Sequence, residues 1–197
     1  MILVHSQRAG ERVLASVTRY LDHTLPLPVN TTKSAVDHLT RRTYLGFKVL
    51  KRRDGFRRGI ASESLRRVRC RLRELTDRQA RGTLPQRIQA VNRVLAGWVG
   101  YFAVADTPTP RRDLDSGVRH RVRASMWTRW KRVRTRYRNL RTFGLPEWRV
   151  RELAGSRKGP WRMAAGPLNR VLTVAYWDDQ GWSRLLNLYE TTRLRWQ

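Results

Sequence analysis

The chain has 197 residues, of which 42 are Lys or Arg and 15 are Asp or Glu, and its formal net charge at pH 7 is +27. Hydrophobic residues make up 40% of it, which is enough for a folded core and excludes a wholly disordered protein. Arginine suits bidentate phosphate contact and no long apolar run occurs, so a nucleic acid is favoured over a membrane as partner, and we expect a cytoplasmic location.

Residues 1–60 are expected to combine strands with one helix. Residues 1–4 are an apolar run typical of a strand, and the spacing over residues 10–25 is that of an amphipathic helix. Residues 29–34 are expected to form a strand edge and a turn. Residues 44–50 have the composition of a second strand, which should return through a hairpin turn at Asp54-Gly55.

Residues 83–102 are expected to form the central helix of the chain. Thr83 followed by Gln86 is the pattern of a capping box, and apolar residues then recur at three- and four-residue spacing. Gly97 and Gly100 lie late in this helix, where the missing side chains predict that another backbone approaches closely.

Two arginine-rich helices are expected to flank the central helix. The first begins at Ser62 and is ended by Gly82. The other follows a loop over residues 105–110 and has one continuous apolar stripe over residues 113–137. Three helices of this kind predict a compact bundle with a strongly basic outer surface.

Charge is unevenly distributed along the chain. Residues 1–60 have 12 basic and 4 acidic side chains, residues 61–145 have 21 and 6, and residues 146–197 have 9 and 5. The net charges are +8, +15 and +4, so the helical middle is expected to bind the polyanion. We predict an α+β chain with three parts over these ranges: a strand-helix-strand region, a mainly helical bundle and a short basic tail.

The tail is less regular than the bundle. Residues 155–162 form a Gly-rich basic stretch, residues 168–176 fit either a helix or a strand, and residues 182–189 are expected to form a last helix. The single cysteine, Cys70, lies in an arginine-rich helical pattern and is expected to be buried or half-buried. The four histidines have no metal-like spacing.

The basic side chains of the bundle and tail are candidates for phosphate contact, and two tryptophans are candidates for base stacking. One tryptophan lies off the apolar stripe of its helix and the other lies between basic residues. The alternative interpretation is that these basic side chains form only a solvated surface. Such surfaces usually contain acidic side chains that balance the charge, and here acidic side chains are few. The candidates are Arg66, Arg67, Arg69, Arg73, Arg119, Arg123, Trp127, Arg129, Lys131, Arg132, Arg134, Lys158, Trp161 and Arg162.

Five short motifs occur in order: Asn30-x-x-Lys33-Ser34, Tyr44-Leu45-Gly46-Phe47, Gly97-Trp98-x-x-Tyr101-Phe102, Trp127-x-x-Trp130-Lys131 and Lys158-Gly159-x-Trp161-Arg162. Together they resemble bacterial group II intron reverse transcriptase/maturases over almost the whole chain, and five in order are more specific than any one. The resemblance implies that residues 1–60 are the end of the polymerase palm, with Lys33 and Ser34 near the template-primer duplex. It also implies that residues 61–145 are the maturase-specific thumb, or domain X.

The same resemblance implies that the polymerase site is missing. In the family, a tyrosine, a variable residue and two aspartates precede the strand matching residues 1–4, and these aspartates with a third hold two Mg²⁺ ions. Because this chain has no counterpart of them, no catalytic residue, metal site or cofactor is expected for it, although the full-length family uses Mg²⁺. A Y-x-D-D-like sequence at residues 176–179 follows the thumb and is interpreted as structural.

The favoured hypothesis is RNA binding of the maturase type, in which the basic thumb grips structured group II intron RNA and assists its splicing. The alternative belongs to the enzyme class: the chain is a C-terminal subunit or truncated portion of an RNA-directed DNA polymerase. It would then be active only with a separate fingers and palm piece, and an RNA–DNA duplex would be a further partner. A third hypothesis is a remnant of a mobile genetic element, or a gene start placed too late.

Overall fold

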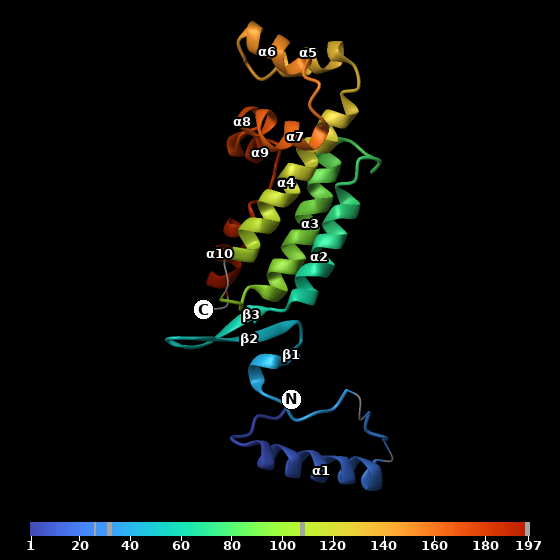
Figure 1. Cartoon of the computed structure of the whole chain (residues 1–197), viewed down its shortest axis with the longest axis vertical. Coiled ribbons are helices and arrows are strands. Elements are labelled where there is room, and N and C mark those ends of the chain that lie inside the picture. Colours follow the sequence, from blue (N-terminus) through green and yellow to red (C-terminus); the bar gives the residue numbers. More distant parts are fainter. Residues whose placement is uncertain (26, 31–32, 107–108, 196–197) are drawn as a thin grey trace. The chain divides into compact units, whose positions relative to one another are not determined.

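The computed structural model describes residues 1–25, 27–30, 33–106 and 109–195 (Figure 1). The chain divides into two compact units, Met1–Ala61 and Ser62–Gln197. The first contains one long helix and a three-stranded sheet, whereas every regular element described in the second is a helix. The α+β fold expected from the sequence is confirmed.

Helix α1 (Gln7–Thr24) begins earlier than the sequence predicts, because the Ser6 hydroxyl accepts a hydrogen bond from the Ala9 amide at 3.2 Å and caps it. Gly10 is buried in this helix. A Cβ atom added there would lie 2.6 Å from Val36 Cγ1 and 3.3 Å from Val4 Cγ2, so only glycine allows the approach.

The strand predicted over residues 1–4 is wrong. These four residues have no regular secondary structure, and their side chains are 41–68% exposed. A strand requires a hydrogen-bonded neighbour, and within the described part of this unit no strand pairs with them.

A short helical turn, η1 (Leu39–Arg41), precedes an antiparallel sheet of order β1-β2-β3: β1 (Thr43–Tyr44), β2 (Phe47–Arg52) and β3 (Gly55–Ile60). The hairpin predicted at Asp54-Gly55 is confirmed, with Arg52 opposite Gly55. The single strand predicted over residues 44–50 is interrupted, because Leu45 and Gly46 take φ angles of 50° and 79° in a turn between β1 and β2.

The strand edge predicted over residues 29–34 is not found in its described part. The amides of Lys33 and Ser34 donate to the carbonyl oxygen of Asn30 at 3.1 and 3.0 Å, which is a turn. Residues 31–32 lie outside the described residues.

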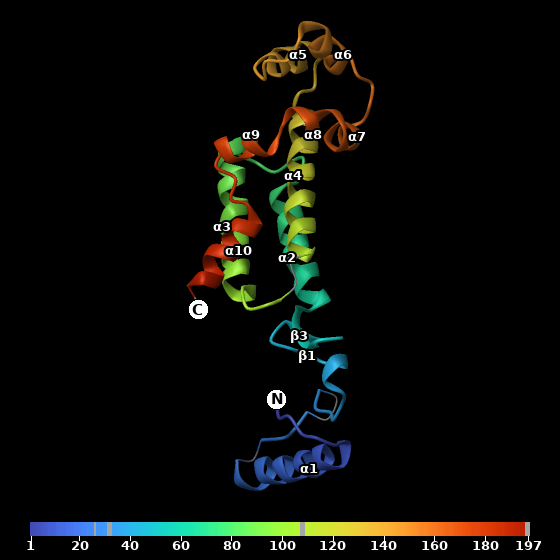
Figure 2. The same ribbon diagram turned by 90° about the vertical axis from the view of Figure 1, so that its left-hand side faces the viewer.

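Four helices form the bundle of the second unit: α2 (Ser62–Leu75), α3 (Leu84–Phe102), α4 (Thr109–Arg129) and α10 (Leu185–Leu194). Helices α2 and α10 each pack against both α3 and α4, and α2, α3 and α4 run along the same general direction (Figures 1 and 2). Their facing apolar side chains form one core, in which Leu72, Val91 and Leu95 are fully buried. None of the described helices is both long and apolar enough to span a bilayer.

Helix α3 begins with the predicted capping box. The Gln86 amide donates to Thr83 Oγ1 at 3.5 Å, and the Thr83 amide donates to Gln86 Oε1 at 2.9 Å. The close approach predicted at Gly97 and Gly100 is wrong, since both are exposed and a Cβ at either would meet no described atom within 4 Å. They lie outside the buried face of α3.

Two helix ends of the bundle differ from the prediction. Helix α2 stops at Leu75, before Gly82, where the Thr76 hydroxyl donates to the Leu72 carbonyl oxygen at 2.7 Å. The loop predicted over residues 105–110 is shorter, because α4 begins at Thr109, and residues 107–108 lie outside the described part. Cys70 is exposed on α2, so its predicted burial is wrong.

The continuous helix predicted over residues 113–137 is also wrong, because the chain breaks between α4 and α5 (Val133–Arg141). The Arg136 side chain explains how the break is stabilised: its Nε donates to the Trp130 carbonyl oxygen at 2.9 Å, and this group would otherwise lack a helical partner. Val133, expected on the apolar stripe, is 56% exposed.

The tail is helical: α6 (Glu147–Ala154), α7 (Pro160–Ala165), α8 (Pro167–Val171) and α9 (Val174–Asp179) precede α10. The Gly-rich basic stretch at residues 155–162 runs into α7 at Pro160, and α10 begins at Leu185, later than expected. Asn92 Nδ2 donates to the Gly181 carbonyl oxygen at 2.6 Å. The Tyr189 hydroxyl donates to the Ala105 carbonyl oxygen at 3.1 Å. These bonds hold the tail on the bundle.

Candidate nucleic-acid interface

Three groups of arginines occur in the second unit. Inner arginines donate hydrogen bonds to neutral groups elsewhere in the unit, paired arginines form ion pairs with acidic side chains, and free arginines are exposed without an ion pair among the described residues. The distinction matters because only a free guanidinium group can form a bidentate contact with phosphate.

Arg87 and Arg123 are the most buried of the inner arginines, at 4% and 5% exposure. Arg87 donates to Ser125 Oγ at 2.8 Å and to the Asp77 carbonyl oxygen at 2.9 Å. Arg123 Nε donates to the Ala164 carbonyl oxygen at 3.0 Å. Burial lowers the pKa of Arg87, and burial, together with the neighbouring Arg119, lowers the pKa of Arg123 to about 10. With a pKa of about 10, Arg123 stays charged near neutral pH.

Two more inner arginines bond neutral groups. Arg121 Nε donates to Thr76 Oγ1 at 3.2 Å, and Arg129 donates to the carbonyl oxygens of Gly82, at 2.9 Å, and Ala80. Because these acceptors are neutral, the hydrogen bonds fix the side chains without cancelling their charge. The inner arginines therefore contribute to the positive potential around the helices.

Five predicted phosphate contacts have partners within the chain. Arg66 and Arg67 face Glu63 on α2, at 2.8 and 3.9 Å. Arg119 pairs with Asp115 at 2.9 Å, with both side chains largely buried. Arg123 and Arg129 are the inner arginines described above. For Arg119 and Arg123 in particular, the predicted direct contact conflicts with their burial.

Trp127 does not fit the predicted stacking role. Its side chain is 1% exposed, and the Arg136 guanidinium carbon lies 4.4 Å from its ring centroid. A base cannot reach a ring that the core and a guanidinium group already cover. Trp161, in contrast, is 58% exposed.

The other predicted residues of this unit are exposed and form no ion pair within the described part of the chain. They come from α2, from the connection of α4 to α5, from α5 and from the tail. They are Arg69, Arg73, Lys131, Arg132, Arg134, Lys158 and Arg162. Lys33 and Ser34 belong to the first unit, and their contact with a nucleic acid stays a prediction.

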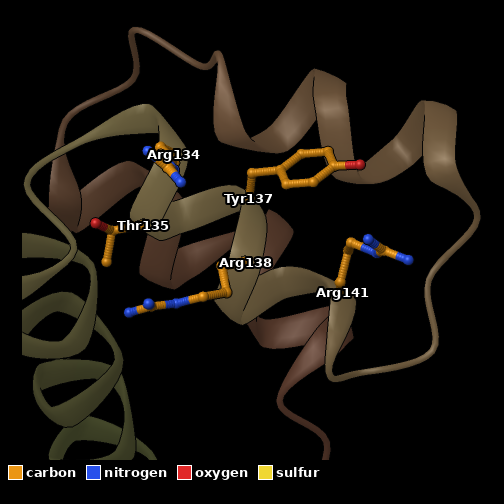
Figure 3. Close-up of a pocket in the computed structure, with 5 residues that line it drawn as sticks. All are labelled: Arg134, Thr135, Tyr137, Arg138 and Arg141. Atoms are coloured by element: carbon orange, nitrogen blue, oxygen red, sulfur yellow. The ribbon is translucent and has the colours of Figure 1, made fainter.

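Helix α5 presents a group of three free cations. Arg134, Arg138 and Arg141, named here the α5 arginine stripe, are exposed and form no ion pair with the described residues. With Thr135 and Tyr137 they line an open depression of about 460 Å³, and Figure 3 shows Arg138 and Arg141 extending from α5 in opposite directions. Like charges four residues apart on a helix repel each other, and a polyanion would relieve that repulsion.

The acid nearest in sequence to this stripe, Glu147, is already engaged. It accepts hydrogen bonds from the Tyr137 hydroxyl and, at 3.1 Å, from Arg151 Nε. The Tyr137 hydrogen bond, followed by Arg151, holds the pKa of Glu147 below its usual value. Tyr137 thus ties α5 to α6 and fixes the carboxylate, while Arg141 lies 6.0 Å from the Tyr137 ring centroid.

Sequence reasoning missed Arg138 and Arg141 as site residues. The signal was present, because Arg134, Arg138 and Arg141 are separated by four and three residues, which places their backbone positions along one face of a helix. The prediction of a single long helix over residues 113–137 concealed this spacing, because the exposed basic face was then expected to follow the direction of α4.

The described residues do not fit the pair of Mg²⁺ ions that the resemblance implies for the full-length family. Nowhere in the described ranges do three His, Cys, Asp or Glu side chains come together as a metal site. The Y-x-D-D-like sequence lies on α9 rather than on a hairpin. Trp177 is buried there, and Asp178 accepts from Arg184 Nε at 2.9 Å. Its interpretation as a structural segment agrees with this geometry.

Comparison with known proteins relates the helical unit to one family. The model of the family described as "Group II intron, maturase-specific domain" matches residues 65–144. This range begins in α2 and ends just after α5, so it contains the α5 arginine stripe. A search of curated proteins gives no match. The maturase-specific domain expected from the sequence is confirmed over the matched residues.

Proposed function

We propose that this chain, whose residues 65–144 form a group II intron maturase-specific domain, binds structured intron RNA and assists its splicing. In this proposal the RNA performs the splicing chemistry. The protein supplies binding energy that favours the splicing-competent fold of the RNA.

The α5 arginine stripe is the observation on which the proposal rests. Three exposed guanidinium groups, none of them in an ion pair with a described residue, lie on one helix inside the matched domain. Phosphate contact by such groups releases condensed counterions, and this supplies most of the affinity of basic proteins for nucleic acids. Structured RNA is recognised largely by its shape and backbone, which suits a stripe of cations.

We place further phosphate contacts at the other exposed cations of the unit. Arg69 and Arg73 lie on α2, Lys131 and Arg132 lie just before α5, and Lys158 lies before α7. The inner arginines add to the positive field without touching the RNA.

The test is binding and splicing with the full chain. We expect tighter binding to a folded group II intron RNA than to an unstructured RNA of equal length, and faster splicing at limiting Mg²⁺. Equal affinity for both RNAs, with no change in splicing, would contradict the proposal. Primer extension on adding a separate fingers and palm piece would instead support the polymerase-subunit hypothesis.

A further inference from the structure

Trp161 has an exposed indole ring that packs against the ring of His120. It lies on α7, is 58% exposed, and its ring centroid is 4.0 Å from that of His120 on α4 at an interplanar angle of 60°. His120 Nε2 is buried and lacks a hydrogen-bond partner among the described residues, so this histidine serves as packing against the indole. A ring fixed in this way loses little conformational freedom when a ligand stacks on it.

The surroundings of Trp161 are basic and free of acid. Residues 153–177 contain no Asp or Glu, whereas Arg157, Lys158 and Arg162 flank the tryptophan. All three cations are exposed and form no ion pair with the described residues. The loop itself is tied to α5, because Arg136 donates to the Ser156 carbonyl oxygen at 3.5 Å.

Trp148 on α6 provides the contrast within the same unit. It is 67% exposed, but the Arg149 guanidinium carbon lies 5.7 Å from its ring centroid. Glu147 is its neighbour in sequence, and Arg149 pairs with Glu152 at 2.6 Å. The cations around Trp148 are thus engaged with carboxylates, and its ring already has a cation over it.

We propose that Trp161 is the stacking platform for one unpaired base of the bound RNA, with Arg157, Lys158 and Arg162 contacting the phosphates on either side. Base–aromatic stacking accepts any base, and flanking cations supply the backbone contacts. This inference rests on the proposed RNA binding and adds a ligand class: a bulged or single-stranded nucleotide rather than a continuous duplex.

The experiment uses the full chain and two RNA hairpins that differ at one bulged position, which holds an adenosine or an abasic nucleotide. We expect the wild-type chain to bind the adenosine bulge about tenfold more tightly than the abasic one. Trp161→Ala should abolish this ratio, Trp161→Phe should keep part of it, and the control Trp148→Ala should leave it unchanged. Because both tryptophans are exposed, both alanine variants should unfold at the same urea concentration as the wild-type chain.

Two results would overturn the inference: a wild-type ratio close to one, or an unchanged ratio in Trp161→Ala. If the chain still binds both hairpins with a steep salt dependence, the proposed function survives and only the stacking site is lost. If it binds neither hairpin, both fail.

Discussion

The guanidinium carbon of Arg136 lies 4.4 Å from the ring centroid of Trp127, whose side chain is 1% exposed. The same guanidinium donates to the carbonyl oxygens of Trp130 and Ser156. One arginine therefore covers an indole, caps the end of α4 and anchors the loop before α7. Trp127, which the sequence offers as a base-stacking residue, is instead part of the core.

Replacing Trp127 should therefore affect stability first. We expect Trp127→Ala to lower the free energy of unfolding by about 3–5 kcal/mol through loss of a buried aromatic, and Arg136→Ala by about 1–3 kcal/mol. Urea denaturation of the full chain measures both values. The exposed Trp148→Ala is the control, and equal midpoints for Trp127→Ala and Trp148→Ala would refute the assignment of Trp127 to the core.

Arg129 and Arg138 should behave differently although each contributes one positive charge. Both side chains are exposed, but Arg129 donates to the carbonyl oxygens of Gly82 and Ala80, whereas Arg138 forms no ion pair within the described chain. We expect Arg129→Ala to lower the free energy of unfolding by about 1–3 kcal/mol, and Arg138→Ala to leave it unchanged. RNA affinity measured at one salt concentration should fall more for Arg138→Ala, and the reverse order would contradict the division into inner and free arginines.

His120 makes the helical unit sensitive to mild acid. Burial, then the nearby Arg123 and Arg121, lower the pKa of His120 below 6.5. As the pH falls below 6.5, the unfolded chain takes up this proton before the folded chain does, so the stability that neutral His120 provides is present above pH 6.5 and is lost on acidification.

The corresponding measurement is urea unfolding at pH 7.5 and pH 5.5. We expect the wild-type midpoint to fall on acidification more than that of His120→Phe, which cannot titrate. The carboxylates whose pKa values are lowered, such as Asp178, titrate at lower pH and do not interfere. Parallel changes in both proteins would show that His120 does not cause the pH dependence.

Local patterns predicted the elements that depend on local chemistry. The Thr83–Gln86 capping box and the Asp54-Gly55 hairpin both occur as expected, because each is determined by hydrogen bonds within a few residues. The apolar face of α3 is predicted in the same way, because the spacing of apolar residues indicates which side of a helix is buried.

Features that depend on distant contacts could not be read in this way. The break after α4 has neither Pro nor Gly, and the apolar spacing from Trp130 to Tyr137 continues through it. It depends on the Arg136 side chain, which periodicity does not reveal. The inner arginines left a weak signal: Arg87, Val91 and Leu95 share i, i+4 spacing, so a cation on the apolar face could have been recognised.

The α5 arginine stripe is tested most directly by the salt dependence of RNA binding. The triple variant Arg134→Ala, Arg138→Ala, Arg141→Ala is compared with a control triple variant, Arg66→Ala, Arg71→Ala, Arg149→Ala. Both variants lose three positive charges. The control arginines are paired with Glu63, Glu74 and Glu152 at 2.6–2.8 Å.

The slope of log affinity against log salt concentration, measured on one folded intron RNA, is the deciding quantity. The account predicts that the slope becomes shallower by about 2–3 for the α5 variant, since each lost phosphate contact removes about 0.7–0.9, and that the control slope stays close to that of the wild-type chain. An equal change of slope in both variants would contradict the account, because net charge rather than the stripe would then determine the affinity.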